Sequence, residues 1–389
     1  MFDFSLFLTD KQSIGFAVLM VLAMIICCLY YGLIYFRVGR WHRTVPAGEG
    51  SGNLSKEALP PVSVVLTARN DASWLKENLV YLLEQDYPDF EVVVVDYLSH
   101  DDTQFVLKLL KDYYPHLKVV PFKEDVNLFQ GKKYPLSIGI KSAKNDILLL
   151  ADPDCTPKNM QWLRGMAKGY LNKETQIVLG FCGLKRTKGL LSLMQQYDNL
   201  CYSSNYLGCA LLGHPYTGSG RNLSYRRNFF FKQGAFINHY NVAGGSDDLF
   251  VYQNAEKGNT AVCIGSDACL STEPKKSFGQ WHRQRLDRVS TRNRHSVKSR
   301  LMEDVLPLAN VAFYAMAVLL LLAGTLPWTV VAIAVLLKWG WQIFSFAQLC
   351  KRFDGGLTYL AAPFLEIYFI IANTILVLTP LDNNRKFGK

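Results

Sequence analysis

The sequence predicts an α/β domain that is built on a mostly parallel β-sheet and flanked by transmembrane helices. Of the 389 residues, 50% are hydrophobic and only 19% are charged. This balance excludes a disordered or fibrous protein and is too apolar for an ordinary soluble one. The apolar residues concentrate near the two ends of the chain. Between those ends, short β-branched runs alternate with helical patterns, as is typical of a parallel sheet covered by helices.

The first apolar segment, residues 13–36, contains no charged residue. As a helix it would be about 36 Å long, enough to cross a hydrocarbon core of about 30 Å. A cleaved secretory signal is the alternative, but the run is too long and has no small-x-small cleavage site. Three arginines follow the segment closely, whereas one lysine precedes it. The positive-inside rule therefore places residues 1–12 outside and the central domain in the cytoplasm.

A second apolar region covers residues 305–378 and predicts two or three further helices. Residues 305–346 are long enough for two spans joined near residues 325–327. Residues 357–378 are a further candidate, although they contain a proline and a glutamate. We expect four spans in all. Because that number would place the basic residues of the tail, residues 379–389, outside, the last segment could instead be re-entrant or lie on the surface.

The central domain, residues 61–300, follows a linker at residues 37–60. We expect strands at residues 61–67, 90–95, 117–121 and 147–150. We expect helices at residues 74–84, at residues 134–143 and in a segment that ends near residue 113. These strands are apolar throughout, which indicates a parallel sheet that is buried on both faces.

Four aspartates follow the predicted strands: Asp71, Asp96, Asp152 and Asp154. The carboxyl ends of parallel strands are where such sheets bind ligands. Four carboxylates at one edge would repel one another unless a cation lay between them. Asp152 and Asp154 are the strongest signal, because Mg²⁺ is often held by one or two carboxylates together with substrate phosphates. For an isolated Asp-x-Asp sequence, a solvated turn is the alternative.

Further segments complete a set that runs in chain order. They are residues 64–71, 94–103, 131–139, 218–226, 246–249, 273–274 and 281–288. With the Asp-x-Asp sequence, this set resembles the motifs of a family-two glycosyltransferase of the GT-A fold, such as the bacterial enzymes that make polysaccharides and glycolipids. In this chain Tyr97 stands where a second Asp is usual, and Asp247 stands in place of a Glu.

The resemblance assigns roles to individual residues. It implies that the nucleotide sugar contacts Thr67, Arg69, Asp71, Asp96, Lys132, Asp152 and Asn222. It implies that Asp152 and Asp154 hold Mg²⁺ or Mn²⁺, and that Asp248, next to Asp247, is the catalytic base. It implies that Trp281, Gln284 and Arg285 lie near the acceptor and the diphosphate. The closing motif is imperfect, since Asp287 and Arg288 stand in the places of Arg and Trp, which favours single-sugar transfer over processive synthesis.

The predicted function is inverting transfer of a sugar from a nucleotide-diphosphate sugar to a hydroxyl acceptor, lipid-linked or glycan, at the cell inner membrane. A single carboxylate base without a second nucleophile implies inversion. Some alternatives remain open: Asp247 and Asp248 could only cap a helix, and Trp281 could equally be a membrane-interface anchor. A catalytically silent nucleotide-sugar-binding partner of a polysaccharide export complex is the second hypothesis, and a transporter is the third. The intact acids argue against the second, and the few spans without repeats argue against the third.

A basic segment, residues 275–300, contains nine Lys or Arg residues and one acid, most of the formal charge of +10. Because it immediately precedes an apolar segment, we expect it to bind anionic lipid headgroups, at about 1 kcal/mol per basic residue. Nucleic acid is the poorer explanation of this charge when apolar spans flank the domain on both sides. We therefore predict membrane lipids as partners and no nucleic acid.

Overall fold

The computed structural model describes residues 10–41, 59–122, 131–240, 242 and 244–378. The predicted tail at 379–389 lies outside these residues, as do most of the N-terminal segment 1–12 and of the linker 37–60. The described chain forms two compact units. The helical unit contains residues 10–40, 196–208 and 295–378. The sheet unit contains residues 41, 59–195 and 209–294, without the gaps given above.

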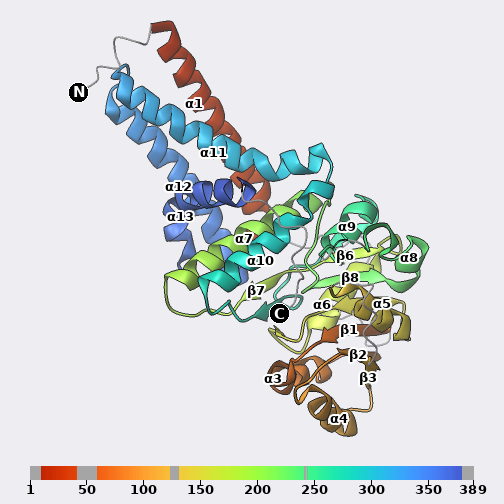
Figure 1. The fold of residues 1–389 in the computed structure, drawn as a ribbon. Coiled ribbons are helices and arrows are strands. Elements are labelled where there is room, and N and C mark those ends of the chain that lie inside the picture. Colours follow the sequence, from red (N-terminus) through yellow and green to blue (C-terminus); the bar gives the residue numbers. More distant parts are fainter. Residues whose placement is uncertain (1–9, 42–58, 123–130, 241, 243, 379–389) are drawn as a thin grey trace. The chain divides into compact units, whose positions relative to one another are not determined.

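The sheet unit is built on a seven-stranded sheet with the order β3-β2-β1-β4-β8-β6-β9 (Figure 1). Its strands are β1 (Val62–Ala68), β2 (Phe90–Tyr97), β3 (Leu117–Phe122), β4 (Ile147–Leu150), β6 (Ile177–Leu179), β8 (Leu223–Arg226) and β9 (Thr260–Val262). Strands β1 to β4 pair in parallel, β8 is antiparallel to β4 and β6, and β9 is parallel to β6. A three-stranded sheet contains β5 (Cys155–Pro157), β7 (Cys182–Leu184) and β10 (Leu270–Thr272). The prediction of an α/β fold with a mostly parallel sheet is confirmed.

The helices of this unit lie between the strands in sequence. They are α3 (Ala72–Leu83), α4 (Thr103–Tyr113), α5 (Lys133–Ser142), α6 (Trp162–Ala167), α8 (Arg227–Lys232), α9 (Asp248–Asn254) and α10 (Phe278–Ser290), with short 3₁₀ turns at Lys168–Leu171, Ile237–His239 and Arg292–Arg294. The apolar faces of α3 and α4 belong to the main core, together with Val64 and Val94. Helix α5 packs close to the sheet at Gly139, where a Cβ atom would lie 2.7 Å from Val65 Cγ1. Only glycine allows this approach.

Strand β2 is longer than predicted, and this changes the place of Asp96. Asp96 lies inside β2, paired with Ala68 on β1 and Pro121 on β3. The strand continues because β3 extends to Phe122, which pairs with Tyr97. The prediction that Asp96 follows the strand is wrong, because the strand ends at Tyr97, two residues later than predicted.

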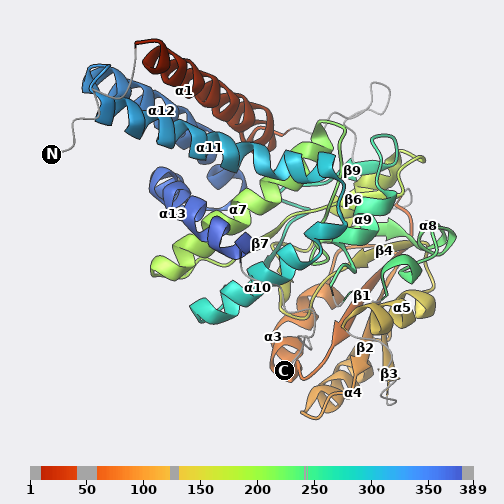
Figure 2. The same cartoon turned by 45° about the horizontal axis from the view of Figure 1, so that its top comes forward.

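The helical unit contains α1 (Asp10–Tyr30), which continues through the π-helical segment Tyr31–Phe36 and α2 (Arg37–Gly39). It also contains α11 (Val297–Ala323), α12 (Trp328–Phe353) and α13 (Thr358–Leu378), while α7 (Leu190–Leu211) contributes residues to both units. Helix α1 runs beside α11 in both views (Figures 1 and 2). Three helices of the described chain are long and apolar enough to cross a membrane: Lys11–Gly39, Val297–Ala323 and Trp328–Phe353.

These three helices correspond to predicted spans. The predicted break near residues 325–327 lies between Gly324, which has a left-handed backbone, and Pro327, which precedes α12. Helix α11 begins eight residues before the apolar run, because Ser296 Oγ accepts a hydrogen bond from Ser299 N–H and caps the helix. The fourth predicted segment is helical, but its described apolar part, Thr358–Asn373, is shorter than the three candidates.

A buried polar network joins the helices of this unit. The carboxylate of Glu366 on α13 accepts hydrogen bonds from Lys338 (2.5 Å), Tyr314 (2.8 Å), Asn310 (3.0 Å), Gln342 (3.0 Å) and Tyr31. These donors come from α11, α12 and the π-helical segment. Lys338 is fully buried and Glu366 is 4% exposed. A charged pair in such surroundings is tolerated only when its partners satisfy it, and each partner here fixes one helix against α13.

Removing one member of this pair should destabilise the helical unit. We expect Lys338→Met to leave the Glu366 charge buried and unpaired, at a cost of about 3–5 kcal/mol. The double variant Lys338→Met/Glu366→Gln should lose less than the sum of the single variants, because no uncompensated charge remains. Thermal unfolding in detergent measures this, with Lys351→Met, an exposed lysine of the same helix, as the control. Additive losses would contradict the coupling of the two side chains.

Candidate active site

The turns after β1 and β2 carry the first predicted residues and are hydrogen-bonded to each other. Asp71 precedes α3, and its Oδ2 accepts the Arg69 N–H at 2.8 Å. The Asp71 N–H in turn donates to Thr103 Oγ1 at 3.0 Å. Asn70 has a left-handed backbone (φ 56°), which Asn tolerates better than most residues, and its N–H donates to Ser99 Oγ. Residues 29 to 32 positions apart thus form one rigid edge.

Two features beside this edge suit a planar, hydrogen-bonding ligand. Asp96 is 2% exposed, and its Oδ1 has no hydrogen-bond partner within the described part of the chain. Buried acceptors are normally satisfied, so this oxygen has the capacity to accept an N–H from a bound molecule. The Arg69 guanidinium lies 5.8 Å from the centre of the Tyr97 ring, which also stacks on Phe122. Thr67, near the end of β1, is half-buried.

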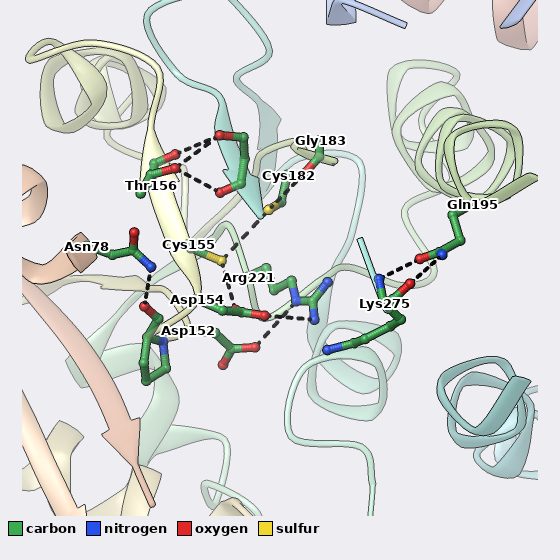
Figure 3. A network of polar contacts seen from close by, with 12 residues as sticks. Asn78, Asp152, Asp154, Cys155, Thr156, Cys182, Gly183, Gln195, Arg221 and Lys275 are labelled. Carbon is green, nitrogen blue, oxygen red and sulfur yellow. Dashed lines mark hydrogen bonds and ion pairs between the residues drawn. The ribbon is translucent and has the colours of Figure 1, made fainter. Parts of the chain in front are cut away.

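Asp152 and Asp154 follow β4 and converge on one guanidinium group (Figure 3). Arg221 Nε lies 3.5 Å from Asp152 Oδ2, and Arg221 Nη2 lies 3.6 Å from Asp154 Oδ2. Lys132 Nζ lies 2.8 Å from the other oxygen of Asp152. The two carboxylates are 23% and 17% exposed, so a ligand in solution can reach them.

The charges at this edge influence one another. Burial alone would raise the pKa of Asp152, but Lys132 and Arg221 lower it to about 2, so this carboxylate is ionised at neutral pH. Burial raises the pKa of Asp71; Asp152 and Asp154 add to the increase, whereas Lys132 opposes it. Asp71 therefore faces the same group of charges as the Asp-x-Asp pair.

The chemistry of this donor set fits a divalent cation. The described residues contain no group of three or more His, Cys, Asp or Glu side chains that could hold a metal alone. Two carboxylates that already converge on a positive charge are nevertheless the oxygen ligands that Mg²⁺ or Mn²⁺ takes when substrate phosphates and water complete the shell. A cation at this position would compete with Arg221 for Asp152 and Asp154.

The second acid pair begins helix α9. Asp247 occupies the N-cap position, but its side chain does not cap the helix. Its Oδ2 instead accepts the Gly220 N–H at 2.6 Å. A Cβ atom on Gly220 would lie 3.0 Å from that oxygen, so glycine permits the contact. The capping alternative is therefore correct for the position of Asp247 but not for its side chain, because the carboxylate binds the loop that contains Gly220 instead. Asp248 is the first residue of the helix.

Two dipeptides connect the two acid pairs. In the first, Gly220 binds Asp247, and the next residue, Arg221, binds Asp152 and Asp154. In the second, Lys132 binds Asp152, and the next residue, Lys133, donates to the carbonyls of His239 and Val242, which precede Asp247 and Asp248 in the chain. Adjacent Cα atoms are about 3.8 Å apart. The structure thus brings both acid pairs to one site.

Asn222 requires a correction. Its side chain is 1% exposed, and all of its polar atoms are used inside the core. Oδ1 accepts the Trp162 Nε1–H at 3.1 Å, and Nδ2 donates to the carbonyls of Phe181 and Ala268, both at 2.8 Å. The prediction that Asn222 contacts the nucleotide sugar is wrong for its side chain, because this side chain is buried in the core and both Nδ2 hydrogens are donated there. Asn222 anchors the turn that presents its neighbour, Arg221.

The residues predicted near the acceptor share helix α10, which Ser277 caps through Gln280 N–H. Trp281 is 2% and Arg285 is 7% exposed. The Arg285 guanidinium lies 5.3 Å from the centre of the Trp281 ring and covers one of its faces. Gln284 is half-buried. This packing leaves less ring surface than either a sugar platform or a membrane anchor would use, and the acceptor role of the three residues stays a prediction.

Two residues of the site were missed in the sequence: Arg221 and Lys133. Each lies inside a motif segment and directly beside a predicted residue, Asn222 or Lys132. A basic side chain next to a glycine or another lysine is common on any surface. Only the partners, which are 69 and 106 positions away, distinguish these two.

Comparison with known proteins agrees with this geometry. Residues 63–249 match Glycosyl transferase family 2. The chain is 27% identical over 148 residues to the probable glycosyltransferase YdaM of Bacillus subtilis, which covers 37% of this chain and 35% of that protein. It is 30% identical over 113 residues to the beta-monoglucosyldiacylglycerol synthase of Synechocystis sp., which covers 28% and 23%. The matched regions thus span about a third or less of these relatives.

A solved structure shows the same fold over most of the chain. A mannosyltransferase from Pyrobaculum calidifontis, in complex with GDP-Man and Mn²⁺, has a TM-score of 0.58 at 20% identity and covers 92% of this chain and 99% of that one. This likeness confirms the predicted GT-A fold. The family match extends from β1 to α9 and includes both acid pairs. Residues 63–249 therefore form a Glycosyl transferase family 2 domain.

Proposed function

We propose that the protein transfers one sugar, with inversion, from a nucleotide-diphosphate sugar to a hydroxyl acceptor at the cytoplasmic face of the inner membrane. The observation that carries this proposal is the convergence of the Asp152–Asp154 pair and the Asp247–Asp248 pair through two adjacent-residue bridges. Transfer from a sugar diphosphate needs positive charge beside the leaving diphosphate and a proton acceptor beside the attacking hydroxyl. The two acid pairs and their basic neighbours are the candidates for these two tasks.

The donor side binds the nucleotide and its phosphates. The Asp96 oxygen that has no partner among the described residues is the acceptor for an N–H of the base, and Asp71 lies in the turn after β1. Lys132 and Arg221 place positive charge where the diphosphate leaves, the position at which negative charge grows in the transition state. When bound, Mg²⁺ or Mn²⁺ held by Asp152 and Asp154 supplies further positive charge to that leaving group.

The acceptor side removes one proton. Asp248 takes the proton of the acceptor hydroxyl as its oxygen forms the new bond to the anomeric carbon. The bond from that carbon to the diphosphate oxygen breaks, and its electron pair leaves with the nucleoside diphosphate. One displacement with one base and no covalent intermediate inverts the anomeric centre. Asp247 holds the Gly220 loop and so positions both acid pairs.

The membrane assignment rests on helix length and on charge. Three helices can span, and the positive-inside rule then places the domain in the cytoplasm. With α1, α11 and α12 as spans, the basic residues after residue 378 stay on the cytoplasmic side only if α13 does not complete a fourth crossing. The diacylglycerol named in the Synechocystis relative and the basic segment 275–300 both favour a lipid-linked acceptor over a free glycan.

Asp248→Asn tests the proposed base. We expect turnover to fall by about 10²–10⁴-fold, because an amide cannot act as the base for the acceptor hydroxyl. The affinity for the donor should stay unchanged. Nucleoside diphosphate release from a panel of nucleotide sugars with Mn²⁺ measures turnover, and calorimetry measures donor binding. Asp112→Asn, at an exposed acid on α4, is the control. Donor binding by the wild-type protein without any turnover would instead favour the silent binding partner.

Arg221→Met tests the cation position. Because the guanidinium competes for Asp152 and Asp154, its removal should tighten the binding of free Mn²⁺ several-fold in the absence of donor. Electron paramagnetic resonance of free Mn²⁺ measures this directly, independently of catalysis. Asp154→Asn should weaken the same binding. Equal Mn²⁺ affinity in all three proteins would place the cation elsewhere.

Anionic lipid tests the acceptor and the basic segment together. In proteoliposomes, we expect transfer to a lipid extract to rise with the fraction of anionic lipid and to be weakened by salt. Replacement of the exposed Lys276 and Arg283 by Gln should reduce this stimulation. Mass spectrometry of the lipids identifies the product, with the Asp248→Asn protein as the blank. Transfer to water-soluble acceptors alone would exclude a lipid acceptor.

A further inference from the structure

A second lysine follows Lys132 and points to a different part of the site. Lys133, the first residue of α5, is 1% exposed and is among the largest fully buried side chains. Its Nζ donates hydrogen bonds to the carbonyl oxygens of His239 (2.5 Å) and Val242 (2.6 Å). A buried ammonium group is costly unless it is hydrogen-bonded and near negative charge.

Negative charge is available from the second acid pair. The carboxylates of Asp248 and Asp247 stabilise the charged form of Lys133, while Arg294 opposes it. Burial is the largest influence and lowers the pKa of Lys133 to about 8, so the group is mostly protonated at neutral pH. His239 adds no opposing positive charge, because burial and the nearby Lys133 lower the pKa of its ring to about 4 and keep it neutral.

The carbonyls that Lys133 binds belong to the segment that leads to the proposed base. His239 ends the 3₁₀ turn Ile237–His239, and Val242 and Gly245, whose φ of 87° favours glycine, precede Asp247. A second contact with α5 joins Ser137 Oγ to the Tyr240 hydroxyl at 3.3 Å. Helix α5 therefore contacts His239, Tyr240 and Val242, and Lys133 makes the charged contact.

We propose that Lys133 is a positioning residue: through the His239 and Val242 carbonyls, its ammonium group fixes the approach to Asp247 and Asp248 and places a positive charge on that side of the site. The proposal rests on the proposed role of Asp248 as the base. It assigns the two adjacent lysines to different tasks, since Lys132 serves the leaving diphosphate and Lys133 serves the proton acceptor.

The proposal predicts the direction of a pH shift. The charged or titratable groups that face Lys133 are Asp247, Asp248, His239 and Arg294. Removing the positive charge of Lys133 makes the ionised form of Asp248 less favourable, which raises the pKa of that carboxyl group. Since transfer needs the ionised form, the acidic limb of the kcat profile should move to higher pH. Neutral His239 cannot offset this change.

Matched lysine variants test the division of tasks. We expect Lys133→Met to lower kcat by about 10- to 100-fold, to move the acidic limb upward by about half a unit to one unit, and to leave the donor KM within about twofold. Lys132→Met should raise the donor KM and leave the acidic limb in place. Lys141→Met, at an exposed lysine near the end of the same helix, should behave as the wild type. An unchanged acidic limb in Lys133→Met would overturn the proposal.

Further variants keep the outcome decisive. Retained affinity for the donor shows that the Lys133→Met protein is folded. If it is not, Lys133→Gln keeps N–H donors without the charge, and the absence of an upward pH shift in that variant overturns the proposal. Lys133→Arg, which keeps the charge, should restore the wild-type limb. Asp248→Asn separates the two levels: residual full activity there refutes the proposed base, whereas an inactive Asp248→Asn with a wild-type pH profile in Lys133→Met refutes only the role of Lys133.

Discussion

The site depends on the compensation of carboxylates that the fold brings to one sheet edge. Asp152 and Asp154 would repel each other if they were left alone, and Arg221 lies within ion-pair distance of both. Lys132 adds a contact at 2.8 Å. In the proposed function, the same residues that balance these charges in the free protein carry the positive charge that a leaving diphosphate requires. Stability of the site and its proposed chemistry therefore use one arrangement of charges.

The two adjacent-residue bridges give the site its rigidity. In one bridge Arg221 binds Asp152 and Asp154 while Gly220 binds Asp247. In the other, Lys132 binds Asp152 while Lys133 binds the carbonyls of His239 and Val242, which precede α9. Contacts in the core support both bridges. Asn222 ties the Arg221 turn to Trp162, Phe181 and Ala268 in the core, and α5 packs closely on the sheet at Gly139. A side chain buried in the core thus positions the half-buried charge of its neighbour.

The helical unit also contains a buried carboxylate whose charge is compensated by neighbouring donors. Its outer surface is apolar, with Leu336 and Leu337 more than 60% exposed, as a helix facing lipid would be. Its interior concentrates polar groups on Glu366, whose carboxylate receives donors from several helices. Without water as a competitor, such a network specifies which helix faces meet, because any other pairing would leave a charge unsatisfied.

The sequence by itself determined the local features: β1 to β4, the apolar helices and their break, and the acids at 71, 152, 154, 247 and 248. These follow from runs of neighbouring residues, since strands, spans and turns are encoded over short windows. Only the tertiary structure decided which groups the basic residues of the site bind. The partners of Arg221 and Lys133 are 69 and 106 positions away. The tertiary structure likewise places Asn222 in the core, and it places Glu366, a single charged residue in an apolar segment, at the centre of a polar network. Such pairings depend on how distant segments fold together, and no local pattern contains that information.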